Sequence, residues 1–331
     1  MLHRSTLHLL AWLMIWAGSA WAQSPPKDPA SAYPNRPIRL LMPFPAGGSP
    51  DALGRTLASQ VESQLGQNIV VDNRTGANGI IAYELTAKAA PDGYTLVHAT
   101  PSFALNTIVY KKLPYDLHKD YSPITNIAQG YGYLLVGHPS VPATSVKDLI
   151  ALAKSGAKPL TFGSPGVGNT LHLAAELINA RGALHMLHVP YKGVAPALTA
   201  LLGGEIQLMI VQPPAGVAQV KAGKLRALGF TGAKRWDGMP DVPTVAESGL
   251  PGFVVHFAWN GWYAPAKTPR EIVVRLQSEV RKALQVPKVR EFFVNSGWEV
   301  LGSTPEELRK YVDAELVRFA EAARVAKIQP E

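Results

Sequence analysis

"PFPAGGSPDALGR", residues 43–55, joins an apolar run at residues 38–42 to the amphipathic pattern of a helix at residues 51–65. Its glycines, Gly47 and Gly48, have two explanations. They can simply let the chain change direction, which is the commoner reason for glycine at a turn. They can also bring backbone N–H groups close to an anion at the start of the helix. Ser49 and Asp51 are ordinary helix-capping residues under either explanation.

The same strand–turn–helix unit recurs along the chain. We predict strands at residues 38–42, 69–73, 94–98, 160–162, 187–189, 206–211 and 225–230. Helices are predicted at residues 51–65, 80–90, 145–155, 170–181, 195–202 and 217–222. Short apolar runs that alternate with helical patterns predict parallel sheets covered by helices on both faces.

Two such series exceed what one core of about 100–150 residues usually holds, so two lobes are expected. The first is predicted to contain residues 33–130 and 254–331, and the second residues 131–253, each a mainly parallel sheet flanked by helices. Strands near residues 133–136 and 253–259 are expected to connect the lobes and to act as hinges. The helices predicted at residues 270–284, 287–296 and 305–327 return to the first lobe.

The first 22 residues predict a secretory signal peptide that is cleaved after Ala22. Arg4 is its only charge, an apolar stretch covers residues 9–17, and Ala20-Trp21-Ala22 gives an A-x-A cleavage site. The apolar stretch is too short to span a bilayer. We therefore expect an exported protein of the bacterial periplasm.

Composition excludes several kinds of chemistry. The 331-residue chain has no cysteine, which excludes thiolate catalysis, Fe–S clusters and zinc–cysteine sites. Its net charge of +8 comes from scattered basic residues, a pattern that argues against nucleic-acid binding and suits attraction of small anions. Phosphate-binding loops, nucleophile elbows and zinc-binding H-E-x-x-H motifs are absent from the sequence, so no cofactor or metal is predicted.

A second glycine-rich junction lies in the other predicted lobe, at "TFGSPGVGNTLHLAAEL", residues 161–177. Two such helix starts, one in each lobe, favour a clamp that holds a small anion from both sides of a cleft. His172, one turn into the second helix, is expected to face this cleft. His185 and His188 flank an apolar strand and are expected to be structural.

The chain resembles the Bug-type receptors, the extracytoplasmic solute-binding proteins associated with tripartite tricarboxylate transporters. The resemblance runs from about Tyr33 to the C-terminal helix. The matching phrases include "YPNRPIRLLMPFPAGGSPDALGR", "GQNIVVDNRTGANG", "APDGYTL", "HVPYKGVAPALTALLGGEIQLM", "DVPTVAESGLPGF" and "GSTPEEL". It implies a two-lobed periplasmic binding protein fold, type II-like, which closes on a small organic acid. It also implies a monomer without catalytic activity that hands its ligand to the membrane components of such a transporter.

In such receptors the backbone amides of the two glycine-rich loops hold a ligand carboxylate. Carried over residue by residue, the resemblance points to Ala46, Gly47, Gly48, Ser49 and Asp51 in the first lobe, to Ser164, Gly166, Gly168, Asn169, Thr170 and His172 in the second, and to Thr100, Ser102 and Gln212 on the remaining walls. A branched side chain at Gly48 or Gly168 is expected to weaken binding, because it crowds the N–H groups and resists positive φ.

Two departures from the family pattern concern the far wall. Val211 stands where the family often has an acidic residue, and Phe103 where it often has histidine. Both changes make the pocket less polar, which predicts a carboxylate with a neutral, apolar or aromatic body in preference to an amino acid. The alternative is that Val211 simply faces the core of its sheet.

Two other functions are compatible with the sequence. A periplasmic hydrolase of the α/β class would need Ser49 or Ser164 activated by His172 as a base. A free-standing chemosensory binding protein would use the same cleft and pass its signal to another partner.

Overall fold

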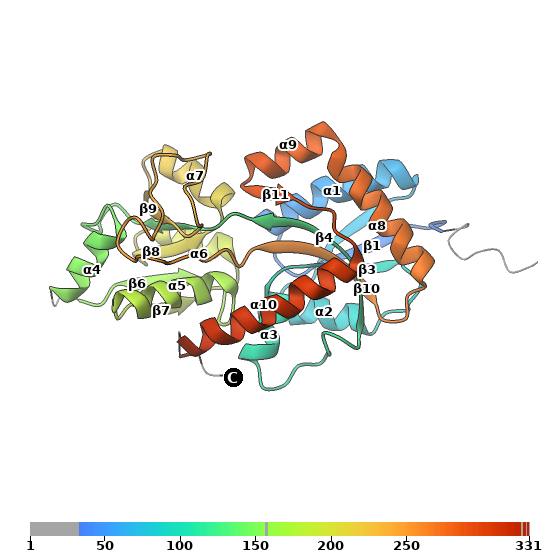
Figure 1. Cartoon of the computed structure of the whole chain (residues 1–331), viewed down its shortest axis with the longest axis horizontal. Helices are drawn as coiled ribbons and strands as arrows, with labels where there is room; N and C mark the ends of the chain where they lie inside the picture. The colour runs from blue at the N-terminus through green and yellow to red at the C-terminus, as the bar shows by residue number, and fades with distance from the viewer. Residues whose placement is uncertain (1–32, 156–157, 326, 329, 331) are drawn as a thin grey trace, which may run out of the picture.

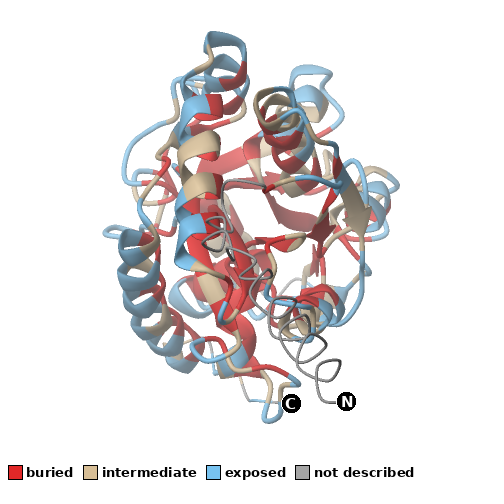
Figure 2. Cartoon of the chain, turned by 90° about the vertical axis from the view of Figure 1, so that its right-hand side faces the viewer, coloured by how far each residue is buried: buried red, intermediate tan, exposed pale blue. Residues whose placement is uncertain are grey.

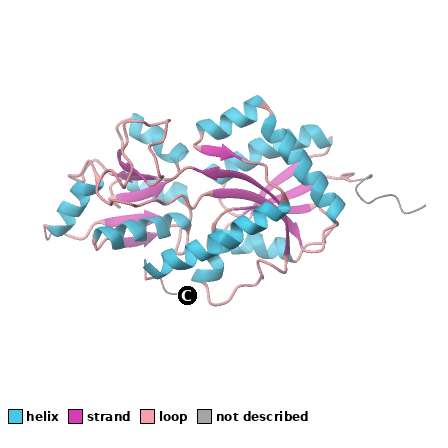
Figure 3. Cartoon of the chain, in the orientation of Figure 1, coloured by secondary structure: helices cyan, strands magenta, loops and turns pink. Residues whose placement is uncertain are grey.

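The computed structural model describes residues 33–155, 158–325, 327–328 and 330. They form two α/β lobes, each built around one sheet, as Figure 1 and Figure 3 show. The predicted signal peptide and its cleavage site lie outside the described residues.

The sheet of lobe one has six strands in the described part of the chain, in the order β11-β4-β10-β3-β1-β2. Their bounds are β1 (Ile38–Met42), β2 (Ile69–Asn73), β3 (Thr95–Ala99), β4 (Tyr121–Gly130), β10 (Trp259–Pro265) and β11 (Trp298–Val300). Three helices pack on one side of this sheet, namely α1 (Ser49–Leu65), α8 (Arg270–Gln285) and α9 (Pro287–Asn295). The other side carries the short helix η1 (Ala77–Gly79), α2 (Ile80–Ala87), α3 (Ser102–Val109) and α10 (Pro305–Val325).

The sheet of lobe two has five strands in the described part of the chain, in the order β7-β6-β8-β5-β9. They are β5 (Leu134–Gly137), β6 (Thr161–Ser164), β7 (Leu187–Pro190), β8 (Leu208–Val211) and β9 (Arg226–Phe230). Four helices surround this sheet, namely α4 (Val146–Lys154), α5 (Thr170–Gly182), α6 (Val194–Leu202) and α7 (Pro213–Lys221).

The two-lobed α/β fold is therefore confirmed, but both sheets are mixed where mainly parallel ones were expected. In lobe one β1 runs parallel to β2 and β3, while β10 is antiparallel to β3 and β4, and β11 is antiparallel to β4. In lobe two β6 is parallel to β7 and β8, while β5 is antiparallel to β8 and β9. The chain enters β5 and β10 directly after it crosses from the other lobe. Both strands therefore start at the opposite end of their sheet from most of its strands.

The elements that were not predicted include α3 and β4. The sequence of β4, "YSPITNIAQG", contains a proline and several polar residues that are typical of a loop. Pro123 lies beside an irregularity in the pairing with β10, where a strand tolerates a missing N–H. Strand neighbours far along the chain, and not local propensity, make this segment a strand.

The chain passes between the lobes from β4 to β5 and again from β9 to β10, next to the predicted hinge segments. Thr231 joins the two crossings: its Oγ1 accepts from the N–H of Tyr133 at 2.8 Å, and its carbonyl accepts from the N–H of Val255 at 2.8 Å. Helix α10 also contacts α3 in lobe one and α5 in lobe two. The residue boundaries predicted for the two lobes remain our proposal.

Buried residues lie mainly on the strands and on the inner faces of the helices, as Figure 2 shows. Helix α8 illustrates the pattern, because its buried positions Ile272, Leu276, Val280 and Ala283 recur every three or four residues on one face. Helices with such apolar faces cover both sides of each sheet. The ends of the strands that face the other lobe are not covered by them and can form a site.

Candidate ligand-binding site

A cavity of about 290 Å³ lies between the lobes. This volume is near the lower end of the range for small-molecule sites, roughly 300–1,000 Å³. Its walls come from the turns that follow β1, β3, β6 and β8, from the start of α6, and from Tyr133, Trp259 and Asn260. None of the described residues that line it carries a charged side chain.

The first loop brings the start of α1 to the cavity. Gly48 is the N-cap and Pro50 lies in the first turn, so the amide groups of Gly48, Ser49 and Asp51 have no partner within the helix. The positive end of the helix dipole adds to these donors. This end of the cavity therefore suits a negatively charged group.

Asp51 holds this loop from behind. Its carboxylate accepts hydrogen bonds from the Gly47 N–H at 3.1 Å, from Arg55 Nε at 3.0 Å and from Asn73 Nδ2 at 2.9 Å. Burial acts to raise the pKa of Asp51, but these hydrogen bonds outweigh it and hold the pKa below its usual range. Asp51 is absent from the cavity lining, so its role here is to position the loop.

The glycines of the first loop differ in conformation. Gly47 has φ of +86°, which favours glycine, whereas Gly48 has φ of −77°, which any residue adopts. The expectation of positive φ at Gly48 is therefore wrong. Crowding of the N–H groups is the remaining reason for a small residue there.

The second loop brings the start of α5 to the opposite wall. Asn169 caps this helix, because its Oδ1 accepts from the Leu171 N–H at 2.9 Å. Asn169 and Thr170 line the cavity. Gly166 and Gly168 both have positive φ, of +144° and +67°, and shape the loop without lining the cavity.

Behind this loop, two histidines form a stacked pair. The rings of His172 and His188 are 3.8 Å apart, and His172 Nδ1 accepts from the Gly168 N–H at 3.3 Å. Burial, together with the neighbouring His172, lowers the pKa of His188 to about 4. His172 was expected to face the cleft, but it supports the loop from behind and does not line the cavity.

These positions also exclude the hydrolase arrangement. Ser164 Oγ lies 2.6 Å from Nε2 of His188, not of His172, and Ser164 is fully buried away from the cavity. Ser49 lines the cavity, but its Oγ has no hydrogen-bond partner in the described part of the chain. Ser49 therefore has no base, and Ser164, although it contacts His188, is not accessible from the cavity.

The predicted site residues thus divide into two groups. Nine of them line the cavity: Ala46, Gly47, Gly48, Ser49, Thr100, Ser102, Asn169, Thr170 and Gln212. The other five lie behind the walls: Asp51, Ser164, Gly166, Gly168 and His172.

The two residues that depart from the family pattern do not line the cavity. Val211 is fully buried in the apolar core of lobe two, as the alternative reading of its strand position required. Phe103 is fully buried in an aromatic cluster, with ring centroids 4.8 Å from Tyr83 and 5.0 Å from Tyr263. The expectation that Phe103 adds apolar surface to the far wall is therefore wrong.

Sequence reasoning missed most of the apolar lining and the residues from β10. Phe44, Leu171 and Leu198 line the cavity, and so do Trp259 and Asn260. The aromatic segment around Trp259 was visible in the sequence, but nothing local indicated that it reaches the cavity. It does so because β10 pairs with β3, which lies far away along the chain.

Asn78 of η1 connects the lobes beside the cavity. Its Nδ2 donates to the carbonyl of Gly168 at 2.9 Å and to Asn106 Oδ1 at 2.7 Å. Its φ of +53° lies in the left-handed region, which asparagine tolerates better than most residues. This contact ties lobe one to the second glycine-rich loop.

We expect Asn78→Gly to loosen the closed arrangement of the lobes. Glycine keeps the left-handed backbone and removes only the bridging side chain. Loss of a hydrogen bond of about 1 kcal/mol predicts roughly fivefold weaker ligand binding. Small-angle scattering of the unliganded variant should give a larger radius of gyration than the wild type, and an unchanged radius and affinity would contradict the bridging role.

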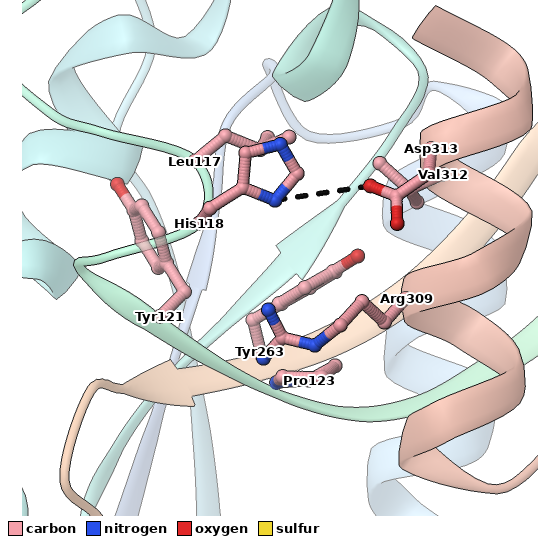
Figure 4. A pocket seen from close by; sticks show the side chains of 8 residues that line it. All are labelled: Leu117, His118, Tyr121, Pro123, Tyr263, Arg309, Val312 and Asp313. Carbon is pink, nitrogen blue, oxygen red and sulfur yellow. Dashed lines mark ion pairs between the residues drawn. The ribbon is translucent and has the colours of Figure 1, made fainter.

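A second, smaller recess lies in lobe one between α10 and the segment before β4 (Figure 4). His118 and Asp313 face each other across it, with Nδ1 and Oδ1 3.8 Å apart. Its volume of about 10 Å³ is that of a single water site. It cannot hold an organic ligand, whereas the interlobe cavity is large enough for a small one.

The chain has known relatives in sequence and in structure. Residues 53–325 match the family described as "Tripartite tricarboxylate transporter family receptor". Protein BugT of Bordetella pertussis is 36% identical over 318 residues, which cover 96% of each chain. The structure of Rpa4515 from R. palustris with adipate is 37% identical, with a TM-score of 0.86 over 90% of this chain and 100% of that chain. MatC from Rhodopseudomonas palustris with bound malate is 31% identical, with a TM-score of 0.82 over 88% and 99%.

Proposed function

We propose that this chain, which belongs to the tripartite tricarboxylate transporter receptor family, binds a small organic carboxylate in the interlobe cavity and delivers it to the membrane components of such a transporter. The family is one of solute receptors, and the chain is a receptor and not an enzyme. Adipate and malate, which Rpa4515 and MatC hold, are both small carboxylates. Family membership favours transport over a free-standing chemosensory role.

One observation carries the proposal. The starts of α1 and α5 reach the same cavity from different lobes, and no described lining residue is charged. An anion in this cavity would be held by backbone N–H groups, hydroxyls and amides from both sides. Such a ligand stabilises the closed form because it bridges the two lobes.

We propose that this receptor works as a monomer in the periplasm, after cleavage of the signal peptide behind Ala22. The described part of the chain contains no helix that is long and apolar enough to cross a membrane.

From the expectation of a neutral body we retain only the preference for an organic acid without an ammonium group over an amino acid, now for a different reason. A buried ammonium needs an anionic partner, and the described lining provides none. Calorimetry with amino acids and their deaminated analogues tests this preference.

A thermal-shift screen of organic acids tests the function. A specific acid at about 100 times its Kd should add about 2.7 kcal/mol to the free energy of unfolding, which raises the melting temperature by several degrees. Incubation with generic esters is the control for hydrolysis and should leave them intact. If no acid in a broad panel raises the melting temperature, the proposed function is wrong.

A further inference from the structure

Asn260, at the start of β10, has a side-chain amide whose NH₂ group makes no hydrogen bond within the described residues. The residue lines the cavity and is only 1% exposed. Its Oδ1 lies 2.7 Å from Nε2 of His98, whereas its Nδ2 has no hydrogen-bond partner among the described residues. A buried N–H group left in this state is unfavourable, so an acceptor should approach it, and the cavity that the residue lines is where a ligand can supply one.

The orientation of this amide is fixed by two residues behind it. The indole N–H of Trp262 donates to Nδ1 of His98 at 3.2 Å, and an indole can only donate. His98 Nδ1 is therefore an acceptor, and the proton of the neutral ring is on Nε2. That Nε2–H donates to Asn260 Oδ1, which leaves Nδ2 on the side away from His98.

Burial keeps this arrangement in one protonation state. His98 is fully buried, and burial lowers its pKa to about 4, although the hydrogen bond to Asn260 and the charge of Asp51 act in the opposite direction. The ring therefore stays neutral near pH 7. A flipped amide would set Nδ2 against Nε2–H, two donors facing each other.

Other unpartnered polar groups surround the same cavity. The Trp259 indole N–H and the Ser49 hydroxyl oxygen also have no partner in the described part of the chain, and both residues line it. Ser49 belongs to the loop at the start of α1, whereas Trp259 and Asn260 belong to β10. The wall of the cavity thus contains unpartnered N–H groups on β10 in addition to those at the helix starts.

We propose that Asn260 is a specificity residue whose amide donates a hydrogen bond to a second oxygen of the ligand, and that His98 and Trp262 are positioning residues that hold the amide in its donor orientation. This inference rests on the proposed function. A carboxylate, carbonyl or hydroxyl oxygen satisfies the amide. A methyl group leaves the amide unpaired, and an ammonium is repelled by it.

Calorimetry with three matched series tests the proposal: unbranched dicarboxylates of four to eight carbons, the monocarboxylates of equal length, and the amino acids whose ammonium ends the chain. The wild type should prefer the dicarboxylate of the best length over its monocarboxylate by about tenfold or more. Asn260→Asp keeps the acceptor for His98 and replaces the N–H donor with a carboxylate oxygen. It should lose this preference and bind the terminal ammonium series better than the wild type does.

Two further variants separate orientation from general damage. Trp262→Phe keeps an aromatic ring and frees His98 Nδ1, so the ratio of dicarboxylate to monocarboxylate affinity should fall by about threefold or more. Asn126→Asp changes an equally buried asparagine of β4 that does not line the cavity, and should leave the ratio unchanged.

The outcomes distinguish the two proposals. If no acid binds the wild type, the proposed function and this inference are both overturned. If acids bind but the affinity ratio is the same in the wild type and in Asn260→Asp, only the role of Asn260 is overturned.

Discussion

Gly168→Val should weaken ligand binding by about 100-fold while the protein stays folded. Gly168 has φ of +67°, and a Cβ atom built there lies 2.4 Å from Cγ2 and 3.1 Å from Cβ of Val109. Gly168 belongs to lobe two and Val109 to α3 of lobe one, so the added side chain acts as a wedge between the lobes. Overpacking of this kind costs about 1–3 kcal/mol, and the lobes relieve it by staying apart.

The measurement is calorimetry with the acid that gives the largest thermal shift. Gly223→Val is the matched control, because Gly223 has φ of +70° and its Cβ would meet nothing within 4 Å. It carries the same backbone strain without the wedge and should keep wild-type affinity.

A second substitution, at Val109, tests whether the steric clash between the lobes causes the loss of binding. Gly168→Ala alone should weaken binding, and adding Val109→Ala should recover most of the loss because it removes the colliding methyl groups. Wild-type affinity in Gly168→Val, or a failure of the double variant to recover, would show that close approach of the lobes at Gly168 is not required for binding.

Asp51→Ala should lower the free energy of unfolding by about 2–3 kcal/mol and weaken binding as well. The change leaves the Gly47 N–H and the Asn73 amide without their acceptor, and it removes the carboxylate partner of Arg55. Chemical denaturation measures the stability change. Because the pKa of Asp51 is held below its usual range, its contribution should be complete above about pH 4 and be lost as the pH falls further.

Asp148→Ala is the matched control for this change. Asp148 occupies the same position in the first turn of α4 and accepts from the Thr144 N–H at 2.9 Å, as Asp51 accepts from Gly47 in α1. Asp148 is only partly buried, whereas Asp51 is buried and also accepts from the Asn73 amide of β2, so a much smaller loss of stability is expected. Equal losses for both variants would mean that Asp51 is only a helix cap.

Local patterns in the sequence were sufficient to predict most of the helices and strands. The apolar run of β1, the glycines after it and the amphipathic repeat of α1 are short-range signals, and they predicted the unit that brings the first loop to the cavity. The second unit, from β6 through α5, followed in the same way. The short α3 and the polar β4 gave no comparable signal.

The sequence by itself determined the two lobes, the two glycine-rich helix starts and the absence of cysteine chemistry, because each depends on residues close together in the chain. Only the tertiary structure decided which of those residues line the cavity. Asp51 and His172 carry the chemistry of a ligand site, but their hydrogen bonds hold the loops from behind. Asn260 had no local signal, and it reaches the cavity because β10 returns from lobe two to lie beside β3, where His98 fixes its amide. The direction in which a polar side chain points depends on partners distant in sequence, and those partners meet only when both lobes have folded.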